Sequence, residues 1–430
     1  MGYILFFILL VELTIIYCWN GKNVVSPSFI GCSLFLFSTL MYLVGSDFYR
    51  YELHFNTIAT IVTLIMCIFL GESFARKIKI KKIEYYNNEF KKETICSNKW
   101  VVFILSLFVL VISVSYFYVV YIFSLKMGNS PGNFLTMGTY TRSALYQGLD
   151  TVQLPFIISQ GVVVTECIVW LCVYCICYNR NVSGKFDKRF MWPIVCYVPQ
   201  LFANDSRTIL LKMISVISII VFTFTKQKVN WSSKGNRKIV KYAIMVIALF
   251  IVVFRVLGYR TGTNDLNSNV MNNIIEYTSA GLVGLDKYLN LGESENTLWG
   301  ESTLKSVYNI FRQWGMDIPK VDSFEPFYTF YGGDSNIYTT FKAYIHDYGF
   351  VGAMLAMVLW GYFITRNIKH IQKNGASFPR MCLVGLMFYG VVMLPITDVT
   401  ASFLAIATVY QAVYLLILEY VFIQEKVRVR

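Results

Sequence analysis

Apolar stretches long enough to cross a bilayer recur along the whole chain, and this feature limits what it can fold into. A helix needs about 20 consecutive, mostly apolar residues to span the hydrocarbon core of a membrane. Hydrophobic residues make up 56% of the sequence and charged residues only 15%, and the mean hydropathy is +0.53. Such values are far from those of a soluble domain. We therefore predict an all-α polytopic integral membrane protein, a bundle of about eleven transmembrane helices.

One hydrophilic insert interrupts the apolar stretches. The predicted spans lie near residues 3–19, 28–44, 56–74, 100–125, 154–178, 190–203, 208–225, 239–257, 341–365, 381–397 and 401–423. The chain thus divides into an N-terminal bundle at 1–257 with about eight spans, a large loop at 258–338, and a C-terminal bundle at 339–430 with about three spans. The first span has no basic residues before it and no small-residue cleavage site, so we expect it to be retained.

The basic residues predict which side of the membrane each loop faces. Lysine and arginine gather in five connections, at residues 75–99, 179–189, 226–241, 366–380 and 426–430. The positive-inside rule places all five in the cytoplasm, with the N-terminus and the insert outside and the C-terminus in the cytoplasm. The insert holds ten acidic and five basic residues. The net charge of +13 is therefore attributed to cytoplasmic anchoring at the membrane and not to nucleic-acid binding.

Two groups of arginines lie at the predicted outer ends of spans. Asp205 and Arg207 belong to a polar turn between apolar segments, and Arg255 and Arg260 end the span before the insert. An arginine at a span end often reaches lipid headgroups, and this remains the alternative for Arg207. A guanidinium can equally bind a phosphate or pyrophosphate bidentately. An arginine within a span is costly enough that a functional role is the default hypothesis for Arg255.

The run from Asn336 to Gly352 leads from the insert into the next span. Lys342 and His346 are four residues apart, so they share one face of a helix. Gly349 and Gly352 follow on that side and are expected to admit the close approach of another chain or of a substrate. His346, which precedes Asp347 in the sequence, is either an interfacial histidine satisfied by its neighbours or a base or phosphate-binding group.

Other polar and aromatic residues are weaker candidates. Arg142 lies in the predicted external loop 126–153, and Arg312 lies in the insert among aromatic residues that could stack on sugars or mark a membrane interface. Most of the ten cysteines lie inside apolar spans, where free thiols are usually structural. Glu293 and Glu295 have no third ligand at a recognisable spacing. We expect no metal and no cofactor.

The chain resembles the Wzy-type polymerases of bacterial O-antigen and capsule, the oligosaccharide repeat unit polymerases, which are related to O-antigen ligases. The resemblance rests on Ser206-Arg207-Thr208 at the start of a span, a long external loop late in the chain, and the run Asn336-Ile337-Tyr338-Thr339 through His346-Asp347-Tyr348-Gly349. It implies a metal-independent glycosyltransferase of the bacterial cytoplasmic membrane. The enzyme would transfer a growing glycan from undecaprenyl pyrophosphate onto a lipid-linked repeat unit at the outer face.

The resemblance and the chemistry of a pyrophosphate leaving group together suggest a role for each candidate. Guanidinium and ammonium groups stabilise the developing negative charge without a metal. The pyrophosphate-binding candidates are Arg207, Arg255, Arg260, Arg142 and Lys342. His346 is the candidate base, with Asp347 and Asp205 as alternatives, and the sequence does not choose among them. Arg312, Asn336 and Tyr338 are the candidates for contacts to sugars.

Expected partners are the undecaprenyl-pyrophosphate-linked oligosaccharide and membrane lipids, with a chain-length regulator and a flippase of the same pathway as further candidates. Two other functions remain open. An O-antigen ligase would use the same chemistry at the lipid and differ only in its acceptor. A lipid-linked oligosaccharide flippase or transporter would place charged residues at mid-span, where Glu166 is the main charged residue predicted from the sequence.

Overall fold

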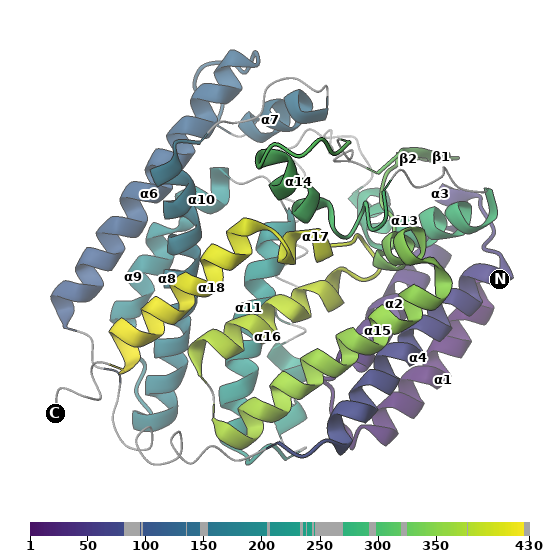
Figure 1. The fold of residues 1–430 in the computed structure, drawn as a ribbon, viewed down its shortest axis with the longest axis horizontal. Helices are drawn as coiled ribbons and strands as arrows, with labels where there is room; N and C mark the ends of the chain where they lie inside the picture. The colour runs from purple at the N-terminus through teal and green to yellow at the C-terminus, as the bar shows by residue number, and fades with distance from the viewer. Residues whose placement is uncertain are drawn as a thin grey trace. The chain divides into compact units, whose positions relative to one another are not determined.

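The chain is mostly helical, with two short strands in its described part (Figure 1). The computed structural model describes residues 1–80, 95, 98–134, 136–146, 154–203, 207–232, 235–237, 239–242, 245, 270–291, 298–319, 325–375 and 377–424. The chain forms two compact units. Unit 1 comprises Met1–Lys81, Asn269–Lys373 and Leu386–Val409, and unit 2 comprises Lys82–Ser268, Asn374–Gly385 and Tyr410–Arg430.

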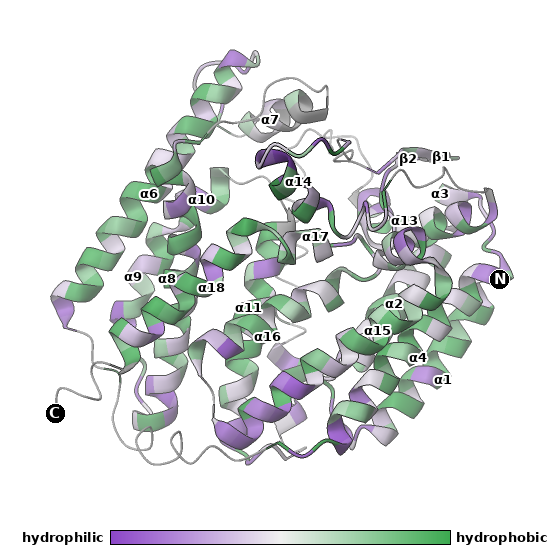
Figure 2. Ribbon diagram, viewed as in Figure 1, coloured by the Kyte–Doolittle hydropathy of each residue, from purple (hydrophilic) through white to green (hydrophobic). Residues whose placement is uncertain are grey.

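Eight helices in the described part are long and apolar enough to cross a membrane, and Figure 2 shows their largely hydrophobic composition. They are Gly2–Trp19, Pro27–Val44, Phe55–Lys77, Lys99–Lys126, Phe156–Ser183, Ile209–Gln227, Thr340–Asn374 and Ile406–Ile423. Each overlaps a predicted span. The prediction of a helical chain with several membrane-spanning segments is confirmed, whereas the count of eleven is not.

Three predicted spans account for the difference. The segment predicted at 190–203 consists of η1 (Lys188–Phe190), α9 (Met191–Cys196) and α10 (Val198–Ala203). Proline lacks an N–H and clashes with the preceding turn, so Pro199 cannot continue α9 and instead lies in the first turn of α10. The segment predicted at 381–397 is α16 (Phe378–Met393), which is shorter than the other spans. Most of the segment predicted at 239–257 lies outside the described residues.

A buried carboxylate joins three helices at one end of unit 1. These helices are α1 (Gly2–Trp19), α2 (Pro27–Val44) and α4 (Phe55–Lys77). The side chain of Glu72 on α4 is fully buried. It accepts hydrogen bonds from Asn20 Nδ2 at 2.9 Å, just after α1, and from the Ser28 backbone N–H at 2.5 Å, in the first turn of α2. These bonds satisfy polar groups at helix termini that would otherwise be costly to bury.

Two glycines let α4 pack closely against α15 (Thr340–Asn374). A Cβ atom at Gly71 would lie 1.9 Å from the Val358 carbonyl oxygen, and one at Gly361 would lie 2.1 Å from the Ile68 carbonyl oxygen. Beyond this contact, Lys369 donates to the carbonyls of Arg76 at 2.7 Å and Ile78 at 3.0 Å. The C-terminal ends of α4 and α15 therefore lie together, and the two helices run in the same direction.

The insert contains regular structure where the sequence predicts a large loop. Its described elements are α13 (Val270–Leu291), α14 (Lys305–Gln313), β1 (Tyr328–Phe330) and β2 (Gly333–Ser335), the two strands pairing as an antiparallel hairpin. We call residues 270–291, 298–319 and 325–338 the cap. The cap contacts α3 (Ser46–Tyr49) and lies at the end of unit 1 where α4 begins (Figure 1). Tyr49 Oη is 3.1 Å from Ser279 Oγ on α13, and the Phe48 and Phe330 ring centroids are 5.3 Å apart.

Unit 2 is built on two long helices, α6 (Lys99–Lys126) and α8 (Phe156–Ser183). Helix α6 packs against α8, α9 and α10, and α8 also packs against α11 (Arg207–Gln227). The short α7 (Met137–Tyr146) joins α6 through a small core of Val120, Met137 and Ala203. The remaining elements are α17 (Thr400–Phe403), α18 (Ile406–Glu419) and a terminal π-helical turn, η3 (Tyr420–Gln424).

The close contact of α4 and α15 predicts a sharp response to added volume. Gly71→Ala and Gly361→Ala should each destabilise the protein by about 1–3 kcal/mol, because the new methyl group meets backbone that must move. Thermal unfolding in detergent measures this effect. Ser73→Ala on the same helix is the control and should change stability little. Wild-type stability in both glycine variants would contradict the packing described.

Candidate functional site

The predicted site residues fall in both units of the chain. Lys342, His346, Asp347, Arg312, Asn336 and Tyr338 belong to unit 1, whereas Arg142, Asp205, Arg207, Arg255 and Arg260 belong to unit 2. Asp205, Arg255 and Arg260 lie outside the described residues, as do the side chains of Arg142 on α7 and Arg207 at the start of α11. The predicted convergence of these arginines with His346 therefore stays a prediction.

Lys342 and His346 lie on a short helical segment at the start of α15. Helix geometry breaks at Gly349, where φ is 68° and ψ is 177°, a backbone region open essentially only to glycine. The residues before Gly349 are held by contacts that do not involve the long helical segment after it. The backbone N–H of Thr340 donates to the Leu394 carbonyl at 2.9 Å, and the Phe341 ring stacks on Phe35 of α2 with centroids 5.1 Å apart.

No other described part of the chain makes the close approach expected at Gly349 and Gly352. Among the described residues, no heavy atom lies within 4 Å of a Cβ placed at Gly349. At Gly352 the nearest atom is Cβ of Tyr348, at 2.3 Å, from the preceding turn of the chain itself. Gly349 lies at the break between the two helical segments, and the expected approach of a substrate stays a prediction.

Tyr288 of α13 contacts both predicted residues of α15. Its hydroxyl lies 3.4 Å from Nδ1 of His346, and its ring centroid lies 5.3 Å from Nζ of Lys342. The Tyr338 ring lies at the same distance from Nζ of Lys342. The four-residue spacing thus places Lys342 and His346 against one side chain of the cap, as the helical pattern predicts.

Lys342 and His346 each have a carboxylate of the cap as a partner. Nζ of Lys342 is 2.6 Å from Oε2 of Glu325, and Nε2 of His346 is 3.0 Å from Oε1 of Glu301. The side chains of Lys342 and His346 are 8% and 6% exposed, whereas those of Glu325 and Glu301 are 31% and 20% exposed. The carboxylates therefore cover the cationic groups on the solvent side.

Asp347 contacts the two residues that directly follow Glu301, the partner of His346. Its carboxylate accepts hydrogen bonds from the backbone N–H groups of Ser302 at 3.1 Å and Thr303 at 2.7 Å, and from Oγ1 of Thr303 at 2.7 Å. The residue is only 4% exposed. Three donors on a buried carboxylate describe an anchor for the segment 301–303, and the carboxylate is not open to a substrate in this arrangement.

The predicted sugar-binding residues differ in their environments. Tyr338 is buried, its hydroxyl donates to the Pro326 carbonyl at 3.1 Å, and burial followed by the charge of Glu325 raises its pKa to about 12. Arg312 on α14 donates to Asn309, and Asn336 is half-buried after β2. Trp299 and Trp314 are 68% and 70% exposed and have ring faces that can stack on a ligand.

A second polar centre, which the sequence pattern does not reveal, surrounds Asp286 of α13. Its carboxylate is fully buried and accepts hydrogen bonds from the Tyr51 hydroxyl at 2.7 Å, from Thr57 Oγ1 at 2.6 Å and from the His54 backbone N–H at 2.7 Å. Nδ1 of His54 is also 2.7 Å from this carboxylate. The His54 side chain is 58% exposed. The partners are 229 to 235 residues apart in sequence, so no local motif reveals them.

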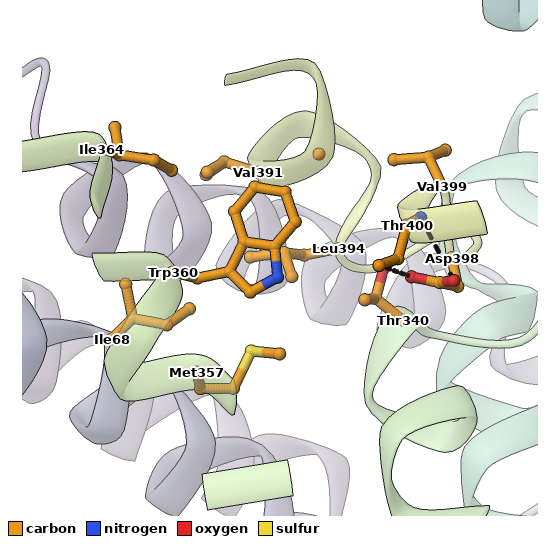
Figure 3. Close-up of a pocket in the computed structure, with 11 residues that line it drawn as sticks. Ile68, Thr340, Met357, Trp360, Ile364, Val391, Leu394, Asp398, Val399 and Thr400 are labelled. Carbon is orange, nitrogen blue, oxygen red and sulfur yellow. Dashed lines mark hydrogen bonds between the residues drawn. The ribbon is translucent and has the colours of Figure 1, made fainter. Parts of the chain in front are cut away.

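A small, mostly apolar pocket lies between α4, α15 and the α16–α17 region of unit 1 (Figure 3). Asp398 lies at its edge and accepts a hydrogen bond from Thr400 Oγ1 at 2.6 Å. Thr400 Oγ1 is 2.7 Å from the Tyr344 hydroxyl, which accepts from Trp360 Nε1 at 2.7 Å. Burial, followed by the charges of Asp347 and Glu325, raises the pKa of Asp398 to about 6 against the hydrogen bonds from Thr400.

Unit 2 holds an ion pair inside its helical bundle. Oε2 of Glu166 on α8 is 2.8 Å from Nζ of Lys212 on α11 and accepts from Gln411 Nε2 at 3.0 Å. Oε1 of Glu166 and Nε1 of Trp170 are buried without a hydrogen-bond partner in the described part of the chain. Lys212 adds a second charge to a region where the sequence analysis emphasised Glu166 alone. Ionisable groups within spans commonly mark functional positions.

Comparison of the chain with protein-family models, with curated proteins and with solved structures gave no match. Among the described residues, no three His, Cys, Asp or Glu side chains are grouped as metal ligands would be. The site is therefore characterised by its own geometry, which brings a buried lysine, a buried histidine and two partly exposed carboxylates together at one end of unit 1.

The Asp286 centre predicts a large stability effect. Asp286→Asn should destabilise the protein by about 3 kcal/mol, because an amide cannot accept from all the donors that surround the buried carboxylate. His54→Gln should cost less, since this side chain is largely exposed. Urea or thermal unfolding in detergent compares the two variants. An Asp286→Asn protein as stable as wild type would show that this carboxylate does not fasten the cap.

The raised pKa of Asp398, which lies outside the candidate spans, predicts a pH dependence. Because the pKa in the folded state exceeds the ordinary value of 3.8, the folded protein binds a proton that the unfolded chain releases between about pH 4 and 6. The stabilisation that comes from binding this proton is complete below the ordinary pKa of 3.8. It is lost as the pH rises through the pKa of Asp398 in the folded protein, about 6.

Wild-type stability should therefore fall by about 1–2 kcal/mol between pH 4 and 6 relative to Asp398→Asn. Thermal unfolding in detergent across this range measures the difference. Asp187→Asn is the control, since Arg189 lowers the pKa of that carboxyl and its titration lies below this range. Parallel pH profiles of wild type and Asp398→Asn would contradict the prediction.

Proposed function

We propose that the chain is a membrane glycosyltransferase that polymerises lipid-linked oligosaccharide repeat units. The observation that supports this most is the pairing of Lys342 and His346 on one helical face beneath the cap. A lysine and a histidine side by side at a helix start can bind adjacent anionic groups, as a pyrophosphate leaving group requires. The predicted outward-facing position of this end adds to the argument, since all basic loops are predicted to lie on the opposite side.

The proposed reaction moves a glycan between two lipid-linked molecules. A hydroxyl of the incoming repeat unit attacks the anomeric carbon of the growing glycan, and the bond from that carbon to undecaprenyl pyrophosphate breaks. The pyrophosphate leaves with the electron pair, and a base takes the hydroxyl proton. Lys342, with His346 when protonated, offsets the charge that develops on the leaving group. The exposed Trp299 and Trp314 offer stacking surfaces for the sugars.

The identity of the catalytic base and the role of the arginines are also part of this proposal. His346 is hydrogen-bonded through both ring nitrogens, so it acts as a base only after one of these contacts opens. Asp347 serves as an anchor, which favours His346 or Asp205 over it for this role. Arg207, Arg255 and Arg260, with Arg142 as a further candidate, are proposed to add positive charge around the pyrophosphate.

The proposal places the protein in a bacterial cytoplasmic membrane with undecaprenyl-pyrophosphate-linked oligosaccharide as substrate. A chain-length regulator and a flippase of the same pathway are its candidate partners. An O-antigen ligase activity would use the same cationic groups and hand the glycan to another acceptor, so it stays the nearest alternative.

One observation favours a transporter as a second candidate function. The Glu166–Lys212 pair lies within the bundle of unit 2 and brings polar side chains from α8, α11 and α18 together. Transporters concentrate such groups near the middle of the membrane. The cationic pair at the end of unit 1, by contrast, is what a transferase acting at the membrane surface needs.

Deletion of the gene, followed by sizing of the surface glycan, separates these functions. A polymerase leaves single repeat units on lipid, a ligase leaves full-length unattached polymer, and a flippase leaves repeat units trapped inside the cell. Only the first result agrees with the proposal.

In complementation, Lys342→Ala and His346→Ala should reduce polymer at least tenfold at equal expression, because transition-state charge stabilisation is worth several kcal/mol. Arg207→Ala and Arg255→Ala should do the same. Lys287→Ala removes a cap lysine that bonds Thr329 and serves as the control with near-normal polymer. Normal chain lengths from the first two variants would remove this site from the reaction.

A further inference from the structure

The two carboxylates that cover Lys342 and His346 lie where an anionic ligand would bind. We propose that Glu325 and Glu301 occupy the two anion subsites of a lipid-diphosphate site, and that the two phosphoryl groups of the ligand displace them. This inference rests on the function proposed above. It identifies the ligand as a lipid with two adjacent phosphoryl groups and gives the cap a role in keeping the empty site closed.

The spacing of the cationic groups fits two adjacent anions. Side chains four residues apart on a helix are neighbours, with about 5–6 Å between their Cβ atoms. Each cationic group holds one carboxylate oxygen, at 2.6 Å for Lys342 and 3.0 Å for His346. Tyr288 contacts both positions and can donate its hydroxyl to an oxygen between them. Two carboxylates therefore mark two subsites that a diphosphate can fill together.

The exposures explain why the carboxylates, and not the cationic groups, would move. Glu325 and Glu301 are 31% and 20% exposed, so they regain full hydration after a small movement. Lys342 and His346 are 8% and 6% exposed and stay buried. A buried ammonium left without an anion is strongly unfavourable, and a buried imidazole N–H left without an acceptor is also costly, so the carboxylates leave only when another anion replaces them. This makes release of the cap carboxylates dependent on the ligand.

The cap can release its carboxylates without detaching. Glu301 lies beside Ser302 and Thr303, whose backbone N–H groups are held by Asp347. Oε2 of Glu301 also accepts from the Leu298 backbone N–H at 3.3 Å, a partner that remains after the contact with His346 opens. On the other side, α13 is fastened through Asp286. Small side-chain movements of Glu301 and Glu325 are therefore sufficient.

Binding of undecaprenyl diphosphate to the full-length protein in neutral-lipid nanodiscs tests this proposal. Glu301→Gln and Glu325→Gln should each bind roughly threefold to tenfold more tightly than wild type, because the ligand no longer displaces a charged group. Asp334→Asn removes an exposed carboxylate of the same cap and should bind as wild type does. In a Lys342→Gln background, Glu325→Gln should give no gain, since both changes act on one subsite.

Two further ligands define which chemical groups are recognised, and two further variants replace any that do not fold. Undecaprenyl monophosphate should bind more weakly than the diphosphate, because it fills one subsite. Inorganic pyrophosphate should compete with undecaprenyl diphosphate if the diphosphate alone is recognised, and should compete poorly if the lipid is needed as well. In both cases the two phosphoryl groups occupy the same two subsites. Glu301→Asp and Glu325→Asp, which keep the charge but shorten the reach, should show smaller gains and replace any glutamine variant that does not fold.

The result that would overturn the proposal is wild-type or weaker affinity in folded Glu301→Gln and Glu325→Gln proteins. An equal gain in Asp334→Asn would also overturn it, because the effect would then come from the overall charge of the cap. The test is independent of turnover. Polymer loss on gene deletion combined with unchanged affinities would reject this inference alone, whereas normal polymer in the deletion strain would reject the proposed function.

Discussion

Buried carboxylates that accept several hydrogen bonds hold the cap on the helices of unit 1, and the arrangement of the candidate site depends on them. Asp286 joins α13 to the start of α4, and Asp347 joins the start of α15 to the segment 301–303. A carboxylate can be buried only when donors replace its hydration. Asp286, in the cap, accepts hydrogen bonds from the helices of unit 1, and Asp347, on α15, accepts them from the cap. The cap is therefore held in one favoured position on these helices. That position brings Tyr288, Glu301 and Glu325 over Lys342 and His346.

The sequence predicted the parts of this structure that depend on local pattern. Eight apolar segments become long helices because length and hydropathy decide helix formation in a membrane. The shared helical face of Lys342 and His346 also follows from spacing alone.

The sequence could not predict what depends on distant contacts. The hydrophilic insert was expected to be a large loop, yet α13 buries Ala280, Leu282 and Leu285 against other elements of unit 1. Asp286 lies 232 residues from His54, and Glu301 lies 45 residues from His346. The role of Asp347 changed from candidate base to anchor for the same reason, since its partners lie in a segment of no distinctive sequence. Small residues at Gly349 and Gly352 suggested close approach, but helices α4 and α15 meet closely at Gly71 and Gly361, which the sequence pattern did not single out.

At this end of unit 1, Lys342 and His346 are buried under two carboxylates that we propose a diphosphate replaces. The most direct test of this proposal is a structure of the protein determined with undecaprenyl diphosphate in a lipid environment. We expect phosphoryl oxygens within hydrogen-bond distance of Nζ of Lys342 and of the His346 ring, with Glu325 and Glu301 turned toward solvent. A diphosphate bound elsewhere, with both carboxylates still paired to Lys342 and His346, would contradict it.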